Sequence, residues 1–318
     1  MRILWYTNGI EMLIFKGNNA MTYLPCSGPL DNPAQRRVLV INDLSCFGKC
    51  SLTVSLPVLA ACGVEAVPLP TAILSTHTGG FPSPYISSMT AAMRGIVAHW
   101  QQIGLRFDAI YSGYLCGEEQ IALVEQLFDE LADEHTLRIV DPVMGDGGKL
   151  YSGFDTAYAA RMKKLCARAD IITPNLTEAA LLTGRDPHAV FDEQAQLDLL
   201  DALLELGAPS VVLTGATRTD ATVGYLYADR TRQKALQLRH DYVDRMLHGC
   251  GDAFASALCG ALMRKKAPES AVRIAADYTL DCIRATLPDA PNHWYGLKYE
   301  SGLAALSARL ACEDTAAK

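Results

Sequence analysis

The chain has 318 residues, of which 50% are hydrophobic and 20% are charged, and this suits one large or two modest globular domains with a substantial core. A net charge of −7 argues against a nucleic-acid or anionic-membrane partner, so small-molecule chemistry is the better expectation. Ten cysteines are scattered without a CxxC pair or a matching histidine spacing, which favours reduced, mostly buried thiols in the cytoplasm.

The N-terminal residues read as an extension. Their apolar pieces are interrupted by polar and charged residues before a signal-peptide core or a membrane span reaches a useful length. Prolines and glycines follow. We therefore expect a loosely ordered extension over 1–35, a single domain over 36–312 and a short C-terminal tail at 313–318.

From residue 38 onward, short apolar runs suited to buried strands alternate with helical patterns. This alternation predicts a mostly parallel sheet covered by helices on both faces. The predicted strands are 38–43, 65–69, 107–113, 137–141, 169–173 and 210–215. The predicted helices between them are 50–62, 86–103, 118–134, 154–168 and 193–206.

After residue 215 the pattern changes. The runs TVGYLYA (222–228) and QKALQLRH (233–240) predict an antiparallel hairpin at a sheet edge, and two closing helices follow at 252–265 and 270–286. Ligands of such sheets bind beyond the carboxyl ends of the strands. Polar residues gather there at Asp43 and Ser45, Ser112–Tyr114, Asp141–Asp146, Thr173–Glu178, Thr214–Gly215 and 248–252. Six such groups predict one shared site.

The stretch HGCGDAFASAL begins at His248 and contains an acid directly after two glycines. Phe254, Leu258 and Leu262 recur every fourth residue and predict a helix that starts near Asp252. A glycine-flanked helix N-terminus suits a phosphate. Asp252 would then accept a proton from a hydroxyl that attacks the phosphate, or else it simply caps the helix.

The glycine-rich segment DPVMGDGGKLY places Asp141 and Asp146 in one predicted loop. Two such acids suit Mg²⁺ held through water, because Mg²⁺ keeps several waters and takes few carboxylates. The alternative is a turn rich in aspartate and glycine.

The segment TPNLTEAALLTG puts Asn175 and Glu178 in the first turn of a predicted helix that ends at Gly184. Their i, i+3 spacing brings both side chains to one face, where they suit metal-bound water and phosphate. The alternative is an ordinary helix start supported by the glutamate. The sequence has no Walker P-loop, so any nucleotide must be held by another device.

Two polar, glycine-containing segments, DLSCFGKCSLT (43–53) and LSTHTGGF (74–81), are predicted to be loops. The hydroxyls of Ser45 and Thr78 suit a small polar ring, and helix caps or turns are the alternative. His77 and His248 have no metal-like companions in the sequence, which favours hydrogen bonding over ligation.

Together, NDLSCFGKCSLT, STHTGG, SGY, DPVMGD, TPNLTE, VLTG and HGCGDAFASAL resemble the pyridoxal/pyridoxamine kinase branch of the ribokinase superfamily, in order from about residue 37 to about 310. The resemblance implies a ribokinase-like α/β fold, a three-layer αβα sandwich with a mostly parallel central sheet and an antiparallel edge hairpin. It also implies a homodimer. The STHTG and SGY segments favour vitamin B6 vitamers over sugars.

By this resemblance, Asp252 would take the proton from the substrate's 5′-hydroxymethyl group, and the backbone of Gly249, Cys250 and Gly251 would form an anion hole. The residues implied for Mg²⁺–ATP are Asp141, Asp146, Thr173, Asn175, Glu178 and Thr214, with Asp141 and Glu178 near Mg²⁺ through water. The residues implied for holding or covering the pyridine ring are Ser45, Thr78, Tyr114 and Tyr151.

Two rival functions stay open, a hydroxymethylpyrimidine kinase of the same fold and a non-catalytic B6 or nucleotide carrier. An intact Asp252 argues against the carrier, since storage needs no base. Cys250 replaces the Thr or Ala common in this motif. A thiol at a helix N-terminus is expected to have a lowered pKa, so Cys250 could add to the aldehyde of pyridoxal; alternatively only its backbone N–H is used.

Overall fold

The computed structural model describes residues 35–312, apart from 218, 220, 232–234 and 244–246, together with the backbone of three short N-terminal strands. These strands are β1 (Ile3–Leu4), β2 (Glu11–Phe15) and β3 (Met21–Pro25), which pair antiparallel with one another. The expectation of a loosely ordered extension and of a tail at 313–318 otherwise lies outside the described residues.

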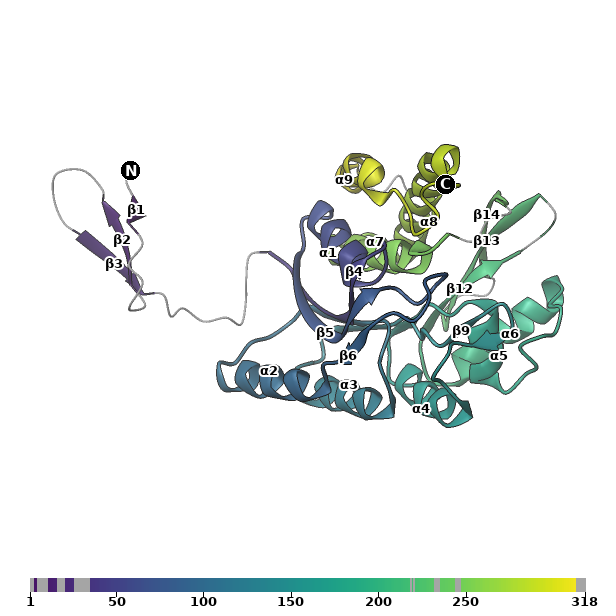
Figure 1. The fold of residues 1–318 in the computed structure, drawn as a ribbon, viewed down its shortest axis with the longest axis horizontal. Coiled ribbons are helices and arrows are strands. Elements are labelled where there is room, and N and C mark those ends of the chain that lie inside the picture. The colour runs from purple at the N-terminus through teal and green to yellow at the C-terminus, as the bar shows by residue number, and fades with distance from the viewer. Residues whose placement is uncertain are drawn as a thin grey trace.

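Nine strands form the central sheet. They are β4 (Arg37–Phe47), β5 (Glu65–Thr76), β6 (Ile86–Ser88), β7 (Ala109–Ser112), β8 (Leu137–Val140), β11 (Ile171–Ile172), β12 (Ser210–Ala216), β13 (Thr222–Asp229) and β14 (Leu236–Asp241). Their order is β14-β13-β12-β11-β8-β7-β4-β5-β6 (Figure 1). The six strands from β12 to β5 run parallel, while β6, β13 and β14 are antiparallel to their neighbours. The predicted edge hairpin is therefore confirmed.

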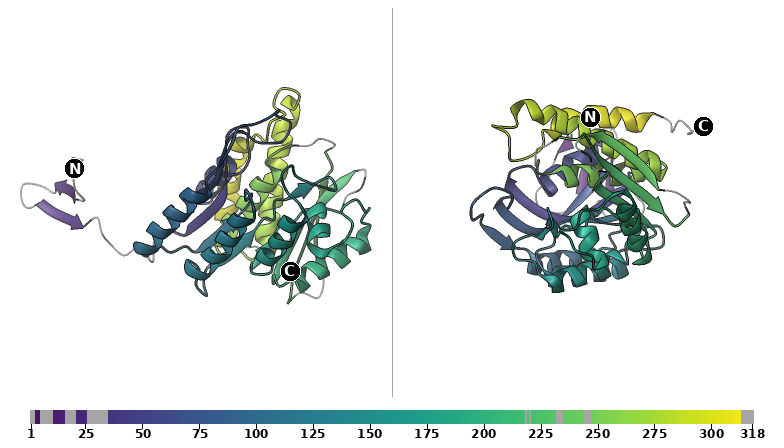
Figure 2. Two further views of the ribbon diagram at one scale, coloured as in Figure 1. Left: turned by 60° about the horizontal axis from the view of Figure 1, so that its bottom comes forward. Right: turned by 90° about the vertical axis from the view of Figure 1, so that its right-hand side faces the viewer.

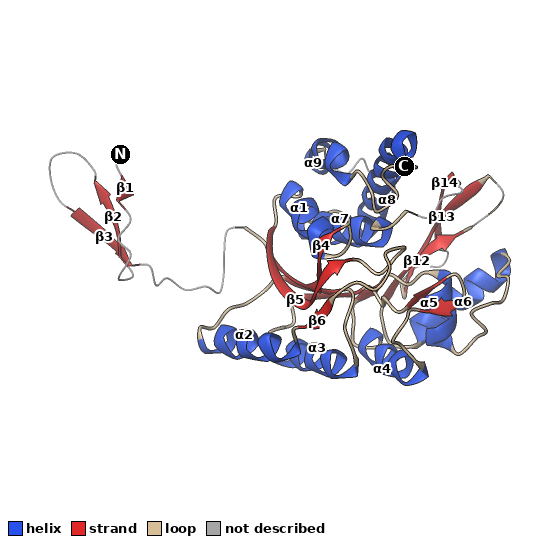
Figure 3. Cartoon of the chain, viewed as in Figure 1, coloured by secondary structure: helices blue, strands red, loops and turns tan. Residues whose placement is uncertain are grey.

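Helices cover both faces of the sheet (Figures 2 and 3). One face carries α1 (Leu52–Ala61), α7 (Cys250–Met263), α8 (Pro268–Thr286) and α9 (Leu303–Ala311). The other carries α2 (Thr90–Gln102), α3 (Glu118–Glu130), α4 (Thr156–Cys166), α5 (Leu176–Thr183) and α6 (Glu193–Glu205). Each face encloses its own apolar core, which confirms the three-layer αβα architecture.

The first core strand shows why the sequence folds into three layers. Successive side chains of a strand point to opposite faces. Val38 and Val40 accordingly belong to the core under α1 and α7, whereas Leu39 and Ile41 belong to the core under α2 to α6. An unbroken apolar run is needed because both faces of this strand are buried.

The sheet has a topological switch point beside β4. The chain passes from β4 to β5 on one side and returns to β7 on the other. The carboxyl ends of β4 and β7 therefore border a crevice, which is where open α/β sheets bind ligands.

Strands β4 and β5 are longer than predicted, and the loop predictions at 43–53 and 74–81 are wrong in part. Residues 44–47 pair with residues 73–76, so both strands continue beyond the core of the sheet. Polar and glycine-rich composition suggested loops, but the pairing partner lies far away in the sequence and supplies the backbone hydrogen bonds. Pro68 and Pro70 are tolerated because β6 covers only Ala72–Leu74, which leaves the earlier part of β5 at the sheet edge.

Two helix predictions also need correction, and one helix was not predicted. The helix expected over 86–103 begins at Thr90, because residues 86–88 form β6 on the edge of β5. The helix expected from Asp252 begins at Cys250, which places Asp252 inside the first turn. Helix α9 was not predicted, and its Leu306 and Leu310 complete the core beside α1 and α8.

The nine described cysteines are all free, as predicted. Four of them are buried, two are exposed and the remaining three are partly buried, so fewer are fully buried than the composition suggested.

Candidate active site

The carboxylate of Asp252 is the centre of the site at the carboxyl end of β4. The Asn42 Nδ2 donates to Asp252 Oδ1 over 3.2 Å. Burial raises the pKa of Asp252 to about 6, and the nearby Ser51 N–H and the Asn42 hydrogen bond oppose that rise because they stabilise the charged form. A carboxylate with this pKa is deprotonated at neutral pH and still basic enough to accept a proton.

Asn42 is itself fixed by the neighbouring strand. Its Oδ1 accepts from the N–H groups of Asp43 (3.1 Å) and Tyr114 (2.9 Å), which leaves Nδ2 directed at Asp252. Gly113 makes room for this amide, since a Cβ there would lie 2.6 Å from Asn42 Nδ2. The orientation of Asn42 is thus dictated by β4 and by the turn after β7.

A second buried acid, Asp43, organises the start of α1. Its carboxylate accepts from the hydroxyl of Ser45 (2.8 Å) and from the hydroxyl of Ser51. Ser51 has φ 57° and ψ −130°, a backbone conformation that is costly for any residue other than glycine. Ser51 therefore contacts Asp43 through its hydroxyl, its N–H lies near Asp252, and its backbone is strained.

The N-terminus of α7 provides backbone donors beside Asp252. The first intrahelical hydrogen bond runs from the Ala253 N–H to the Gly249 carbonyl (3.0 Å), so the N–H groups of residues 250–252 precede it. Gly249 has φ 85°, and a Cβ there would lie 2.2 Å from the Lys49 carbonyl oxygen. These features agree with the anion hole implied for Gly249, Cys250 and Gly251.

Two further buried carboxylates, Asp141 after β8 and Glu178 of α5, lie near each other, and Asp141 faces this helix end. A Cβ on Gly251 would lie 3.7 Å from Asp141 Oδ2, which places Asp141 against the start of α7. Burial, followed by the charge of Asp252, raises the pKa of Asp141 to about 7. Burial and the charge of Asp141 also raise the pKa of Glu178. Buried acids without a balancing cation are the donor set that a divalent ion suits.

Asn175 and Glu178 form a capping box at the start of α5. The Glu178 N–H donates to Asn175 Oδ1 (2.9 Å), and the Asn175 N–H donates to Glu178 Oε2 (2.9 Å). The same pair holds the loop after β8, since the Met144 N–H donates to Glu178 and Asn175 Nδ2 donates to the Gly145 carbonyl. The alternative considered for this segment, an ordinary helix start supported by Glu178, is therefore observed in the structure.

The two acids predicted to lie together in the loop after β8, Asp141 and Asp146, have different environments in the structure. Asp141 is buried, whereas Asp146 is exposed in a small hairpin of β9 (Gly145–Asp146) and β10 (Lys149–Leu150). Tyr151 follows this hairpin and is 40% exposed. Partial burial and the charges of Glu178 and Asp146 raise the pKa of Tyr151, so its hydroxyl lies near the carboxylates of these two residues.

A cavity of about 240 Å³ opens beside the same helix end. Thr214 and Gly215 of β12 line it together with Cys250 and Gly251. Its apolar walls come from β13, the segment between β14 and α7, α7 itself and α8, and they include Val223, Val243, Leu247, Phe254, Leu280 and Ile283. Thr173 is buried at the end of β11, and the cavity wall does not include it within the described residues.

The residues predicted for a substrate ring have different environments. The buried Ser45 hydroxyl donates to Asp43, Tyr114 is partly buried against Phe154 with ring centroids 5.7 Å apart, and Thr78 is exposed. Beside Thr78, His77 shares a hydrogen bond with the Tyr295 carbonyl (2.8 Å). His77 therefore has a hydrogen-bonding role, as predicted.

The hypothesis of a reactive Cys250 thiolate is wrong for this structure. Burial raises the pKa of Cys250 to about 12, because desolvation outweighs the helix dipole. The Sγ donates to the Leu247 carbonyl (3.2 Å). The thiol is therefore protonated and engaged at neutral pH, and the alternative in which only the backbone N–H is used fits better.

Asn42 and Ser51 were not predicted from the sequence, and Asp43 was predicted only as one of the polar residues at the strand ends, without a role of its own. The polar end of VLVIND was a usable signal for Asn42 and Asp43, because it marks the carboxyl end of a buried strand. Ser51 carried no local signal, since its role depends on an unusual backbone conformation.

Within the described part of the chain, no group of three His, Cys, Asp or Glu side chains is arranged to hold a metal by protein ligands alone. The pair of Asp141 and Glu178 suits an ion that keeps most of its water. Among the same residues, no helix combines the length and hydropathy needed to span a membrane.

Comparisons with known proteins agree with this geometry. The phosphomethylpyrimidine kinase family model matches residues 55–295. A pyridoxine/pyridoxal/pyridoxamine kinase of Bordetella avium is 31% identical over 260 residues, covering 78% of this chain and 85% of the relative.

Two solved structures are similarly related. One is a Bacteroides thetaiotaomicron protein described as a phosphomethylpyrimidine kinase and crystallised with pyridoxal, with a TM-score of 0.81, 32% identity and coverage of 86% of this chain and 96% of that one. The other is the pyridoxal kinase of Lactobacillus plantarum, with a TM-score of 0.78, 32% identity and coverage of 86% and 97%. The chain is therefore an enzyme of the phosphomethylpyrimidine kinase family and belongs to its pyridoxal kinase branch, within the ribokinase-like superfamily.

Proposed function

We propose that this enzyme transfers the γ-phosphoryl group of ATP to the 5′-hydroxymethyl group of pyridoxal, pyridoxamine or pyridoxine in an Mg²⁺-dependent reaction. The observation that carries the proposal is the carboxylate of Asp252, which has a raised pKa and lies in the first turn of α7 beside the unpaired helix end. The pyridoxal bound to the Bacteroides relative supports a B6 vitamer as acceptor.

In this reaction Asp252 accepts the proton of the attacking hydroxyl as the bond to phosphorus forms. Asn42 holds the carboxylate in place through its hydrogen bond, and the nearby Ser51 N–H stabilises its charge. The N–H groups of Gly249, Cys250 and Gly251 stabilise the negative charge on the transferred phosphoryl group. Base and anion hole lie on one helix turn, so attack and charge stabilisation occur at the same point.

The nucleotide occupies the cavity between the edge hairpin and α8, with Thr214 near its phosphate end. Thr173, Asn175 and Asp146 are the remaining residues proposed on the nucleotide side. Asp141 and Glu178 would hold Mg²⁺ through water, since both acids are buried and neither forms an ion pair with a described residue. The ion supplies positive charge that offsets the phosphate oxygens.

The acceptor ring lies near the ends of β4, β5 and β7, where Ser45, Thr78 and Tyr114 are proposed to hold it and Tyr151 to cover it. Ser45 acts through Asp43, because its hydroxyl donates to that carboxylate. The family resemblance adds a homodimer and a cytoplasmic location to the proposal.

The test is ADP release with each B6 vitamer and with hydroxymethylpyrimidine, in the presence of Mg²⁺ and after its removal by EDTA. We expect turnover with at least one B6 vitamer and loss of turnover in EDTA. Faster turnover of hydroxymethylpyrimidine would favour the alternative kinase. Binding without ADP release from any acceptor would favour a carrier.

A further inference from the structure

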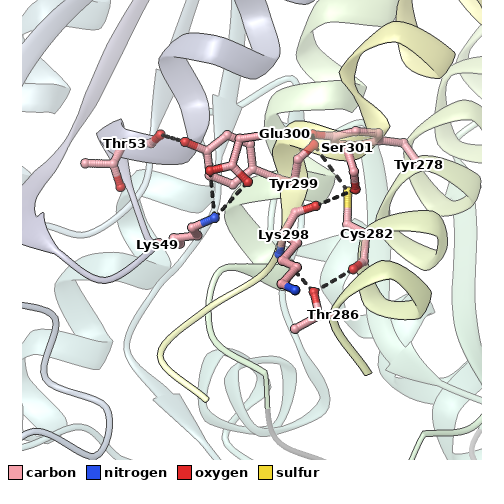
Figure 4. A network of polar contacts seen from close by, with 9 residues as sticks. All are labelled: Lys49, Thr53, Tyr278, Cys282, Thr286, Lys298, Tyr299, Glu300 and Ser301. Atoms are coloured by element: carbon pink, nitrogen blue, oxygen red, sulfur yellow. Dashed lines mark hydrogen bonds and ion pairs between the residues drawn. The ribbon is translucent and has the colours of Figure 1, made fainter. Parts of the chain in front are cut away.

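The short segment that contains Ser51 is clamped from both ends by one loop of the C-terminal region. Lys49 precedes Ser51, and its Nζ contacts both carboxylate oxygens of Glu300 at 2.6 and 2.7 Å (Figure 4). Thr53 follows Ser51, and its carbonyl accepts from the Tyr299 hydroxyl at 2.8 Å. We name Lys49, Tyr299 and Glu300 the latch.

The backbone of the same loop adds to these contacts. The Lys49 N–H donates to the Tyr295 carbonyl (3.2 Å), and the Leu297 N–H donates to the His248 carbonyl (3.1 Å). The loop therefore joins the Ser51 segment to the residues that lead into α7. These two segments touch each other directly, since a Cβ on Gly249 would lie 2.2 Å from the Lys49 carbonyl oxygen, and α7 carries Asp252 in its first turn.

The latch is anchored in the body of the protein. Tyr299 is only 9% exposed, and its carbonyl accepts from the Tyr278 hydroxyl of α8 at 3.2 Å. The Lys298 N–H donates to Thr286 Oγ1 at 2.8 Å (Figure 4). The Lys49 ammonium also lies 5.2 Å from the centre of the Tyr299 ring. Helix α8 thus holds the loop, and the loop holds the Ser51 segment.

Ser51 needs such support because its backbone is unfavourable. A non-glycine residue at φ 57° persists only when its surroundings over-determine the conformation. Without restraint at Lys49 and Thr53, the segment would relax. The hydrogen bond of Ser51 to Asp43 and the contact of the Lys49 carbonyl with Gly249 would then change, which would shift the start of α7 that carries Asp252. We propose that Lys49, Tyr299 and Glu300 are positioning residues, which act through Ser51 to hold the base Asp252 for phosphoryl transfer.

This inference rests on the proposed function, and the variants Glu300→Gln and Tyr299→Phe, singly and together, test it. Asp289→Asn is a matched control, because Asp289 pairs with Lys298 in the same region and is 58% exposed, against 53% for Glu300. Exposed ion pairs contribute little to stability, and Tyr299→Phe removes one hydrogen bond while keeping the packing of the ring, so all variants should stay folded with melting temperatures near the parent's. Lys49→Arg should preserve the latch.

We expect the double variant to lose kcat about tenfold, since a small misplacement of a reacting group is costly, while KM for ATP stays within about twofold. Asp289→Asn and Lys49→Arg should match the parent. A double variant with parental kcat, or one that raises only KM, would overturn the proposal. So would a kcat loss in Lys49→Met without a loss in Glu300→Gln, because Lys49 would then contact phosphate directly.

A second measurement keeps the latch testable apart from the B6 assignment. Turnover is measured with whichever acceptor the parent phosphorylates, including hydroxymethylpyrimidine, so a failed B6 prediction leaves the comparison intact. Hydrogen–deuterium exchange is measured in parallel on the full-length protein. Faster exchange across residues 49–54 in the double variant, but not in Asp289→Asn, is expected; unchanged exchange would contradict the latch even for a parent without activity.

Discussion

At the scale of single residues, the site depends on a balance at one carboxylate. Burial favours the protonated form of Asp252, whereas the nearby Ser51 N–H and the hydrogen bond from Asn42 favour the charged form. The resulting pKa of about 6 lies just below neutral pH. A lower pKa would make the carboxylate a weaker base, and a higher one would leave it protonated.

Replacing the base tests this assignment directly. Asp252→Asn keeps the size of the side chain but cannot take the hydroxyl proton, so we expect kcat to fall by about 10²-fold or more. Binding of ATP and pyridoxal should persist, because the anion hole uses backbone N–H groups. Steady-state kinetics and equilibrium binding measure the two effects. Near-parental turnover would remove Asp252 from the mechanism.

The pH dependence follows from the same pKa. Only the deprotonated carboxylate accepts a proton, and its pKa is raised from 3.8 to about 6. Activity should therefore be high above pH 6 and should fall as the pH drops through that value. We expect kcat/KM to show this acid limb in the parent. The residual activity of Asp252→Asn is the control, and a limb of the same midpoint in that variant would assign the titration to another group, such as the substrate.

How far the site could be predicted differs between residues for a physical reason. Asp252, Asp141 and Glu178 lie in segments whose local pattern of glycine, acid and apolar residues already indicates a helix start or a turn. Ser51 owes its role to contacts with residues distant in sequence, Asp43 through its hydroxyl and Asp252 through its N–H. No local pattern reports such contacts.

At the scale of helices and strands, the apolar periodicity predicted the core elements well. Both cores and the edge hairpin follow from runs such as VLVIND, because burial on two faces demands continuous apolar residues. The extensions of β4 and β5 were missed, since residues 44–47 and 73–76 form strands only through pairing with each other. Helix α9 was missed although its sequence is helix-compatible, because short helices depend mainly on tertiary packing.

The start of α7 offers a matched pair of glycine substitutions. A Cβ at Gly249 would meet the Lys49 carbonyl at 2.2 Å and would require φ 85° of an alanine, so we expect Gly249→Ala to lower the free energy of unfolding by about 1–3 kcal/mol or more. At Gly251 a Cβ would lie 3.7 Å from Asp141 Oδ2, an ordinary contact. Gly251→Ala should therefore keep the stability of the parent and lose activity, because the added methyl group would narrow the space proposed for the transferred phosphoryl group.

Chemical denaturation and ADP-release kinetics on both variants separate these effects. Equal stability of Gly249→Ala and Gly251→Ala would contradict the close approach of the Lys49 carbonyl to α7. Parental activity in Gly251→Ala would place the transferred phosphoryl group elsewhere.

At the scale of the whole molecule, one domain carries every described part of the site. The sheet starts at Arg37 with β4, and the two cores draw their buried residues from Val38 to Leu310. The ion pairs of Arg36 with Asp108 and of Arg37 with Glu65 fasten the start of β4 to its neighbours. The residues of the proposed site lie between Asn42 and Glu300, so we expect substrate binding and chemistry to need only residues 36–312.

A chain that begins at Arg36 after an initiating methionine should therefore fold and function. It retains both cores, the ion pairs at the start of β4 and the whole of the proposed active site. We expect its melting temperature to stay within about 2 °C of the full-length value, because both cores are kept, and its kcat/KM within about twofold. Calorimetry and ADP-release kinetics on the two proteins make the comparison. A large loss of either quantity would show that residues 1–35 dock on the domain and contribute to its stability or its site.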